Sequence, residues 1–391
     1  PYDSVPEAHL AMAQAAANAG DAARALGEIE RCLQLRPDWE SAAIIQAQLL
    51  AAQSNQQAIA SLDQFVGGYP DAQEARMTLA RLLMAEKRFD EARQHFDKLI
   101  EKNPENTQII YLVGMLALQH GDAASGRTHL EKLLKTDFPD KSAVHYFLGQ
   151  LDQEQNKPDS ALAHFNEVVG GEHLVPARSR AAQILWQQGK PEEALKLLRI
   201  TALAFPAERT QLILAESQLL REQGRQNDAY IVLETALTSQ PDNQELLYEA
   251  ALTAERLGKP EILESRLRHL LKLNPDHAHA LNALGYSLAD RNLHLSEAHN
   301  LIARALTFLP NDPFILDSMG WVLYRQGKLV DARKTLERAY GIRDDAEIAA
   351  HLGEVMARMG SRDEAKKFLG EASTRHPGNE LISNALKKLN H

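Results

Sequence analysis

The hydrophobic and polar positions of this chain repeat with a period close to 34 residues. Within each period, two stretches with apolar residues at helical spacing flank a short polar turn that often contains glycine, such as Gly20, Gly189 or Gly327. A proline that can stop the second helix closes most periods. These prolines lie 33 to 35 residues apart, or twice that distance, and they are Pro37, Pro70, Pro104, Pro139, Pro206, Pro241, Pro275, Pro310 and Pro377. The pattern therefore predicts eleven helix-turn-helix units.

Each unit also pairs a small residue in its first helix with a large apolar residue in its second helix. Ten of the eleven small positions hold Ala, Gly or Ser, and the large position is Ile, Leu or Phe throughout. Examples of such pairs are Gly149 with Phe165, Gly285 with Leu301, and Gly353 with Leu369. A small residue beside a large one lets two helices approach closely without leaving a void.

The predicted fold is all-α, with one continuous array of repeats over residues 1–391. The repeats are expected at residues 6–38, 39–72, 73–106, 107–141, 142–174, 175–209, 210–243, 244–277, 278–312, 313–345 and 346–378. Residues 379–391 carry one apolar stripe opposite polar side chains, as expected for the capping helix that a terminal repeat needs.

The period, the small positions and the closing prolines together resemble the tetratricopeptide repeat (TPR) family. This resemblance implies an α-α superhelix whose first helices line a concave, protein-binding groove. Applied column by column, it gives twelve candidate groove residues, mainly aromatic, Arg, Gln and Met side chains. They are Arg81, Tyr111, Met115, Tyr146, Gln183, Trp186, Gln218, Arg221, Tyr248, Tyr286, Trp321 and Tyr324.

Charge and composition narrow the possible partners. The chain has 43 basic and 53 acidic residues and a formal net charge of −10, which disfavours nucleic acid as the main partner. Its single cysteine, Cys32, excludes an internal disulfide, and no stretch of 18 apolar residues is present that could span a membrane. A protein ligand is therefore the expected partner.

The sequence contains no motif that predicts catalysis or a cofactor. Phosphate-binding glycine loops, the GxSxG elbow and the HExxH zinc motif are all missing. Five histidines fall close together, at His269, His277, His279, His294 and His299, but no cysteine or carboxylate pair joins them. We therefore expect polar surface histidines there, no metal site, no cofactor and no enzymatic activity.

Three C-terminal strings, at residues 281–292, 311–329 and 347–360, resemble the TPR lipoproteins of Gram-negative outer membranes. The resemblance is strongest to those that partner a periplasmic carboxyl-terminal processing protease. It implies an adaptor that brings this protease to its substrates, the peptidoglycan hydrolases, on the periplasmic side of the outer membrane. The chain begins with Pro1, and we expect the signal peptide and lipid anchor of such a protein to precede it.

Three other interpretations stay open at this point. One is a TPR lipoprotein scaffold of a polysaccharide-export or envelope-assembly complex. A second is a cytoplasmic scaffold, and a third is an enzyme whose site follows no known motif.

Overall fold

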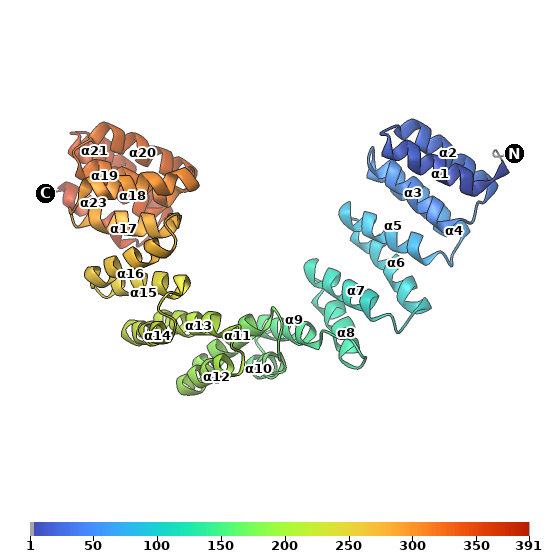
Figure 1. Ribbon diagram of the computed structural model, residues 1–391, viewed down its shortest axis with the longest axis horizontal. Coiled ribbons are helices and arrows are strands. Elements are labelled where there is room, and N and C mark those ends of the chain that lie inside the picture. The colour runs from blue at the N-terminus through green and yellow to red at the C-terminus, as the bar shows by residue number, and fades with distance from the viewer. Residues whose placement is uncertain (1–3, 391) are drawn as a thin grey trace. The chain divides into compact units, whose positions relative to one another are not determined.

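The computed structural model describes residues 4–390, which form 23 α-helices and no strand (Figure 1). The first eleven helices are α1 (Pro6–Asn18), α2 (Ala22–Leu35), α3 (Glu40–Ala51), α4 (Asn55–Gly68), α5 (Gln73–Ala85), α6 (Phe89–Lys102), α7 (Thr107–Gln119), α8 (Ala123–Leu134), α9 (Lys141–Glu154), α10 (Pro158–Asn166) and α11 (Leu174–Gln187). The next six are α12 (Pro191–Ala204), α13 (Arg209–Glu222), α14 (Gln226–Ser239), α15 (Gln244–Arg256), α16 (Pro260–Leu273) and α17 (Ala278–Asp290). The last six are α18 (Leu295–Phe308), α19 (Pro313–Arg325), α20 (Leu329–Ile342), α21 (Ala346–Arg358), α22 (Arg362–Arg375) and α23 (Glu380–Asn390). Eleven helical pairs and one final helix confirm the predicted fold class.

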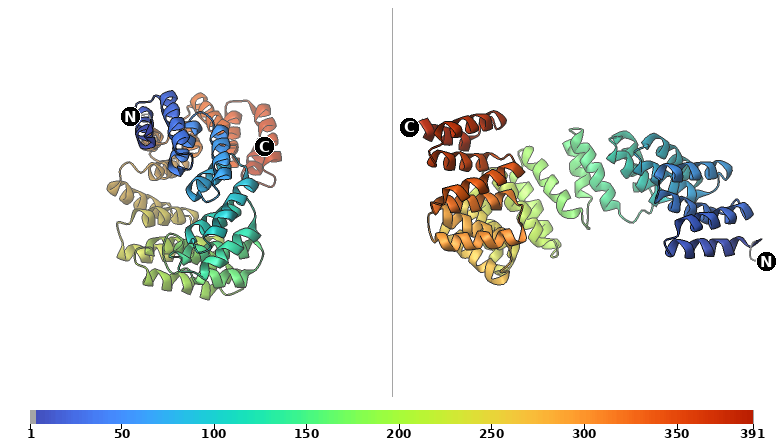
Figure 2. Two further views of the ribbon diagram at one scale, coloured as in Figure 1. Left: turned by 90° about the vertical axis from the view of Figure 1, so that its right-hand side faces the viewer. Right: turned by 90° about the horizontal axis from the view of Figure 1, so that it is seen from above.

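The helices group into two compact units that divide between Ala177 and Arg178, within α11. In each unit, consecutive helices lie side by side (Figure 2). We call the first helix of each pair, with an odd number, helix A and the second helix B. The expectation that residues 1–391 form one continuous domain stays a prediction, and the two units are described separately below.

Local sequence explains where the helices start and stop. Several N-terminal carboxylates accept a backbone N–H of the first turn, as Asp122 does from Ser125 and Asp312 does from Ile315. Five of the described helices begin with proline at the first turn, where no N–H is needed: α1, α10, α12, α16 and α19. Most turns from helix A to helix B contain a residue with positive φ, usually glycine, for example Gly327 at 78°. The glycines that the sequence places in these turns thus end helix A in a left-handed conformation.

The small and large positions meet in the core of each pair. A Cβ built on Gly149 would lie 2.6 Å from the ring of Phe165, and one on Gly353 would lie 2.6 Å from Leu369. Helix A and helix B thus approach as closely as glycine allows. The predicted partner of Gly285 was wrong by one residue, since Ile302 faces it and is fully buried while Leu301 is only half-buried. The cause is one extra residue in the turn before α18, where His294 adopts a left-handed conformation.

None of the helices within residues 4–390 is both long and apolar enough to cross a membrane.

Candidate protein-binding surface

The A helices of the C-terminal unit converge on one another. Tyr286 on α17 lies two repeats away from Glu347 on α21, yet its hydroxyl donates a hydrogen bond to the Glu347 carboxylate at 3.3 Å. Helix α19 also contacts both α17 and α21. Side chains can reach past the intervening repeat only on the inner side of a curved stack, so the A helices line that side within this unit.

A cavity of about 600 Å³, which we call the C-terminal hollow, lies among the A helices of this unit. It is lined by aromatic, acidic and basic side chains of α17, α19 and α21 and of the capping helix α23. The lining residues are Tyr286, Trp321, Glu347, Ala350, His351, Glu354, Leu381, Asn384, Ala385, Lys387 and Lys388. Acidic and basic side chains flank an aromatic floor, so the hollow can accept a polar or mixed ligand rather than a purely apolar one.

A network of polar contacts fixes the floor of the C-terminal hollow. Nδ1 of His351 lies 2.9 Å from both carboxylate oxygens of Asp317, whose side chain is buried. The Trp321 ring stacks on the His351 ring with centroids 4.2 Å apart, and its indole N–H donates to Asp290 at 3.2 Å. The guanidinium of Arg325 lies 4.9 Å from the Trp321 ring centroid. The aromatic rings are thus held in one arrangement before any ligand arrives.

The hollow also changes the acidity of two of its side chains. Burial lowers the pKa of His351, but the hydrogen bond from the ring to Asp317 and the charge of that carboxylate outweigh burial and raise the pKa above its usual value. The pKa of Tyr286 is raised by burial and by the negative charges of Glu347, Asp290 and Asp317. The carboxylates of Asp317 and Glu347 contribute to both shifts, so negative charge acts on His351 and Tyr286 at this part of the hollow.

A second cavity, which we call the N-terminal hollow, lies on the A helices α3, α5 and α7 of the other unit. It measures about 470 Å³, and its walls include Ile44, Met77, Arg81, Ile109 and Leu112. Five apolar side chains share the wall with six polar or charged ones, among which exposed Arg81 and Glu74 supply the charges. This surface therefore offers both polar and adaptable apolar contact, because methionine fits irregular partners readily.

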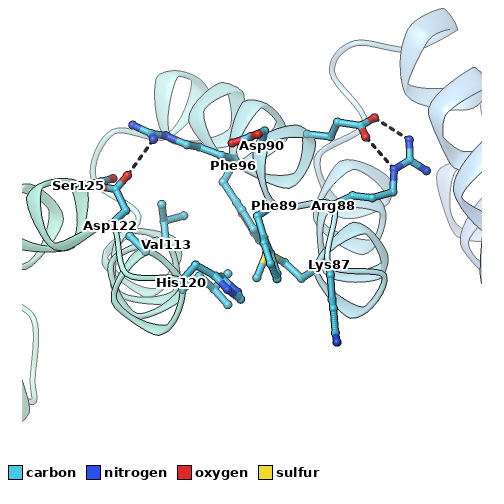
Figure 3. Close-up of a pocket in the computed structure, with 14 residues that line it drawn as sticks. Lys87, Arg88, Phe89, Asp90, Phe96, Val113, His120, Asp122 and Ser125 are labelled. Carbon is cyan, nitrogen blue, oxygen red and sulfur yellow. Dashed lines mark hydrogen bonds and ion pairs between the residues drawn. The ribbon is translucent and has the colours of Figure 1, made fainter.

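A third cavity, of about 370 Å³, lies at the turns between α5 and α6 and between α7 and α8 (Figure 3). Phe89 and His120 stack with ring centroids 3.3 Å apart, and Arg93 pairs with Asp122 at 2.9 Å. The sequence did not single out these residues, because the stacked rings belong to consecutive repeats and to no common column of the repeat.

The predicted groove residues of the N-terminal unit occupy separate environments. Arg81 lines the N-terminal hollow. Tyr111 stacks on Phe138 with centroids 5.1 Å apart, and Tyr146 stacks on His173 at 4.6 Å. Met115 is half-buried on α7. Partner contact at these four positions stays a prediction.

The C-terminal unit holds the other eight, and two of them line the C-terminal hollow, Tyr286 and Trp321. Tyr324 lines an adjoining cavity and donates a hydrogen bond to Glu354 at 3.1 Å. Trp321 is only 5% exposed, so most of its surface packs in the core and only its edge faces the hollow. The remaining five lie outside these cavities. Gln183 is half-buried, and exposed Gln218 donates a hydrogen bond to Glu222. Trp186 lies beside Arg225, Arg221 forms an ion pair with Glu249, and Tyr248 lies beside His277.

Among the five histidines that are close in sequence, His269, His277 and His279 have separate surroundings. His269 pairs with Asp242 at 2.8 Å, and the His277 ring accepts the Ala280 N–H at the start of α17. The rings of His277 and His279 lie 6.5 Å apart and nearly perpendicular. Among residues 4–390, the group that brings three potential metal ligands together is instead Asp317, Glu347 and His351. Its signal in the sequence is the spacing, since Glu347 and His351 are one helical turn apart and Asp317 lies 34 residues before His351.

Comparison with known proteins agrees with this geometry. Two protein-family models, both described as tetratricopeptide repeat, match the chain. One matches residues 111–177, 179–243 and 248–313, which are just over half of the chain, and the other matches residues 49–116 and 323–389. The TPR repeat-containing protein PA4667 of Pseudomonas aeruginosa is 40% identical over 212 residues, which are 54% of this chain and 36% of that protein. The human tetratricopeptide repeat protein 34 is 28% identical over 164 residues, 41% of this chain and 26% of that protein. The chain therefore matches about a third of the length of these relatives.

Among solved structures, the TPR protein TTC0263 of Thermus thermophilus is 24% identical and covers 46% of this chain and 97% of its own, with a TM-score of 0.42. Stacked repeats of this kind present extended surfaces to protein ligands, and the matching models indicate no catalytic family. The helical pairs, the small and large positions and the model matches lead to one conclusion: the chain belongs to the tetratricopeptide repeat family and is a protein-binding scaffold.

Proposed function

We propose that this scaffold is a non-enzymatic adaptor that binds a periplasmic carboxyl-terminal processing protease and delivers peptidoglycan hydrolases to it. The observation that carries the proposal is the pair of hollows on the A helices, which differ in chemistry. One adaptor must hold two unlike proteins. A hollow of mixed aliphatic and polar side chains and a hollow with aromatic rings and several charges suit two unlike ligands.

The side chains on these surfaces support binding of proteins rather than of small metabolites. Arg and Tyr are enriched among the residues that contribute most to protein interfaces, and Arg81, Tyr286 and Tyr324 lie in or beside the hollows. An adaptor that holds protease and substrate together raises their effective concentration and so accelerates cleavage without a catalytic residue of its own.

The proposal places the protein on the periplasmic side of the outer membrane, held by a lipid anchor at its N-terminus. The support is the resemblance of residues 281–292, 311–329 and 347–360 to outer-membrane TPR lipoproteins. Growth of the natural strain, separation of its membranes and detection of the protein in the outer-membrane fraction would test the location.

The function is tested by measuring how fast a purified carboxyl-terminal processing protease degrades a peptidoglycan hydrolase with and without this chain. We expect faster cleavage with the chain present. Arg81→Glu should weaken one binding event by reversing a charge in the N-terminal hollow, and Tyr324→Ala should weaken another by removing an aromatic contact beside the C-terminal hollow. Either variant should slow the assisted cleavage and leave the unassisted rate unchanged.

Matched controls come from the B helices of the same units. Lys98→Glu introduces an acidic side chain at an exposed position of α6, and Tyr340→Ala removes a tyrosine from α20. Each should leave the acceleration intact. An absence of acceleration by the wild-type chain would contradict the proposal, and equal losses in the A-helix and B-helix variants would remove the hollows from the mechanism.

A further inference from the structure

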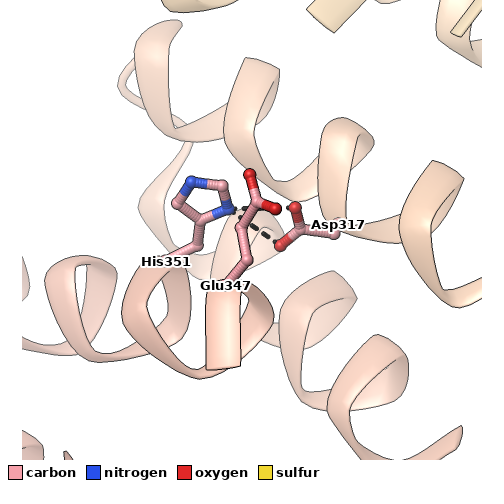
Figure 4. Close-up of side chains that lie close together, drawn as sticks. All are labelled: Asp317, Glu347 and His351. Atoms are coloured by element: carbon pink, nitrogen blue, oxygen red, sulfur yellow. Dashed lines mark hydrogen bonds and ion pairs between the residues drawn. The ribbon is translucent and has the colours of Figure 1, made fainter. Parts of the chain in front are cut away.

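Asp317, Glu347 and His351, which we call the triad, lie together on two neighbouring A helices of the C-terminal unit (Figure 4). Glu347 and His351 share one face of α21 because they are four residues apart, and Asp317 faces them from α19. One potential ligand atom of each residue lies within 4.8 Å of the other two. Two carboxylates and one imidazole thus converge from elements whose packing holds them in place.

The donor atoms of the triad select one class of ion. Magnesium and calcium prefer sites made of oxygen ligands, whereas zinc readily accepts an imidazole nitrogen together with carboxylate oxygens. Zinc sites that exchange ligands have three protein donors and one open position, which is the number that the triad supplies. The ligand atoms of a tetrahedral site are about 3.3 Å apart at zinc–ligand distances near 2 Å, so a small rotation of exposed Glu347 would complete the site.

The surroundings of the triad are those of a cation site. Asp290 and Glu354 lie nearby but pair with Arg325 and Lys388, so the two carboxylates of the triad are the ones left to meet a cation. Glu347 also receives the hydrogen bond from the Tyr286 hydroxyl. The Trp321 ring stacks on the His351 ring and limits its rotation. Hydrogen bonds and packing of this kind orient metal ligands in known sites. The two carboxylates of the triad attract a divalent cation, and the packing reduces the entropy lost when the ligands are fixed.

We propose that Asp317, Glu347 and His351 bind one zinc ion, with its open coordination position facing the C-terminal hollow. Glu347 and His351 line that hollow, so a water molecule or a donor side chain of a bound protein can reach the fourth position. The competing arrangement is a protonated His351 ring that forms an ion pair with Asp317 alone. The proposal is independent of the protease partnership, because it needs only the folded C-terminal unit.

The test is calorimetric titration of the full chain, freed of metal by chelation and dialysis, with zinc chloride alone. We expect one stoichiometric site. Glu347→Gln should weaken it by more than the roughly 10- to 100-fold loss seen when a partner that merely orients a ligand is removed. Since Glu347 is exposed, this variant should keep the helical content of the wild type, which circular dichroism would check. Asp317→Asn should also weaken binding, with buried volume nearly unchanged.

The chain has 15 histidines, so zinc bound elsewhere must be separated from zinc bound at the triad. Asp344→Asn is the matched control, because Asp344 and His376 form an exposed pair at 2.8 Å on the same unit. It should leave the stoichiometric site unchanged. X-ray absorption of the zinc complex should report one nitrogen and two carboxylate ligands. Absence of a stoichiometric site, or equal weakening by Glu347→Gln and Asp344→Asn, would overturn the proposal in favour of the ion pair.

Discussion

The two units use the same repeat for different kinds of surface. The N-terminal hollow has walls of aliphatic and Met side chains interspersed with polar ones and contains no aromatic residue, whereas the C-terminal hollow has an aromatic floor fixed by buried polar contacts. In the C-terminal unit one apolar core runs continuously from Leu233 to Leu389, and Trp321 belongs to it. In the N-terminal unit, Arg81 holds the same repeat position, one residue after the small one, and its side chain is exposed. The same position facing the inner side can therefore belong to the core in one unit and to the surface in the other.

Buried carboxylates show the same contrast. Burial raises the pKa of Asp152 in the N-terminal unit, but hydrogen bonds from Ser160 and Arg127 outweigh it and lower the pKa below its usual value. In the C-terminal unit burial raises the pKa of Glu216, and its bond from Arg199 does not fully compensate. The two arginine partners differ in exposure: the side chain of Arg127, beside Asp152, is 23% exposed, and that of Arg199, beside Glu216, is 54% exposed. A well-enclosed partner stabilises a buried charge more than a solvated one does.

The largest expected effect is that of Trp321→Ala. Removal of a buried indole leaves a cavity and deprives His351 of its stacking partner, so we expect a loss of about 3 to 5 kcal/mol in the unfolding free energy of the C-terminal unit. Met77→Ala in the N-terminal hollow should lower the unfolding free energy of the N-terminal unit by about 1 kcal/mol, as expected for a half-buried side chain. Hydrogen exchange of backbone amides measures the stability of each unit separately: α19 and α21 report on the C-terminal unit, and α5 reports on the N-terminal unit. Equal costs for the two variants would remove the distinction between the hollows.

Asp152→Asn should have the next largest effect. At neutral pH it should lower the free energy of unfolding by about 1 to 3 kcal/mol, because it leaves buried polar groups with a weaker partner. The lowered pKa means that the wild-type carboxylate contributes fully above its unfolded pKa of about 3.9. That contribution disappears as pH falls through the lower folded pKa. Urea unfolding at several pH values should show that the difference in unfolding free energy between wild type and variant shrinks as the pH falls. The control is Asp137→Asn at an exposed position, and a gap that does not depend on pH would contradict the assignment.

Glu216→Gln should change the free energy of unfolding less than Asp152→Asn does. The pH dependence that it removes has the opposite sign, because the pKa of Glu216 is raised whereas that of Asp152 is lowered. A raised folded pKa means that the protonated form is favoured in the native state. Wild-type stability therefore declines as pH rises from the unfolded value of about 4.3 through the folded pKa. The variant should remove this decline and change stability at neutral pH by less than about 1 kcal/mol, since Arg199 is mostly solvated. The same urea series measures it, and a decline that persists in the variant would assign the effect to another group.

The smallest expected effect on stability is that of Arg81→Ala. Its side chain is exposed on the N-terminal hollow, so unfolding free energy should change by no more than about 0.5 kcal/mol. Thermal unfolding followed by circular dichroism would check this. A larger loss would mean that Arg81 supports the fold, and the charge reversal used to test protein binding would then need another residue.

Much of the fold could be predicted because it depends on local spacing. Proline and glycine positions indicated the helix ends, and small residues such as Gly149 and Gly353 indicated where helices cross. The partner of Gly285 was mistaken because one added residue in a turn shifts the following helix by about 100°, which moves Ile302 into the place expected for Leu301. Such a shift cannot be seen in a column of similar apolar residues.

The candidate sites were predicted less completely. The repeat positions selected Arg81, Tyr286 and Trp321 as groove residues, and in the structure these three side chains line cavities, because position on a helix determines which face a residue occupies. Their contact with a partner stays a prediction. They did not indicate that Trp321 is 5% exposed, nor that Asp317 meets His351, since both depend on how neighbouring repeats curve.

The repeat, the helical pairs and the family could all be predicted from the sequence, because they follow from periodic spacing within about 34 residues. The folded chain was needed to show which polar residues meet between repeats and which aromatic side chains are buried. Contact between α17 and α21, two repeats apart, depends on the curvature of the stack. That curvature is the sum of many small packing angles, and no single stretch of sequence specifies it.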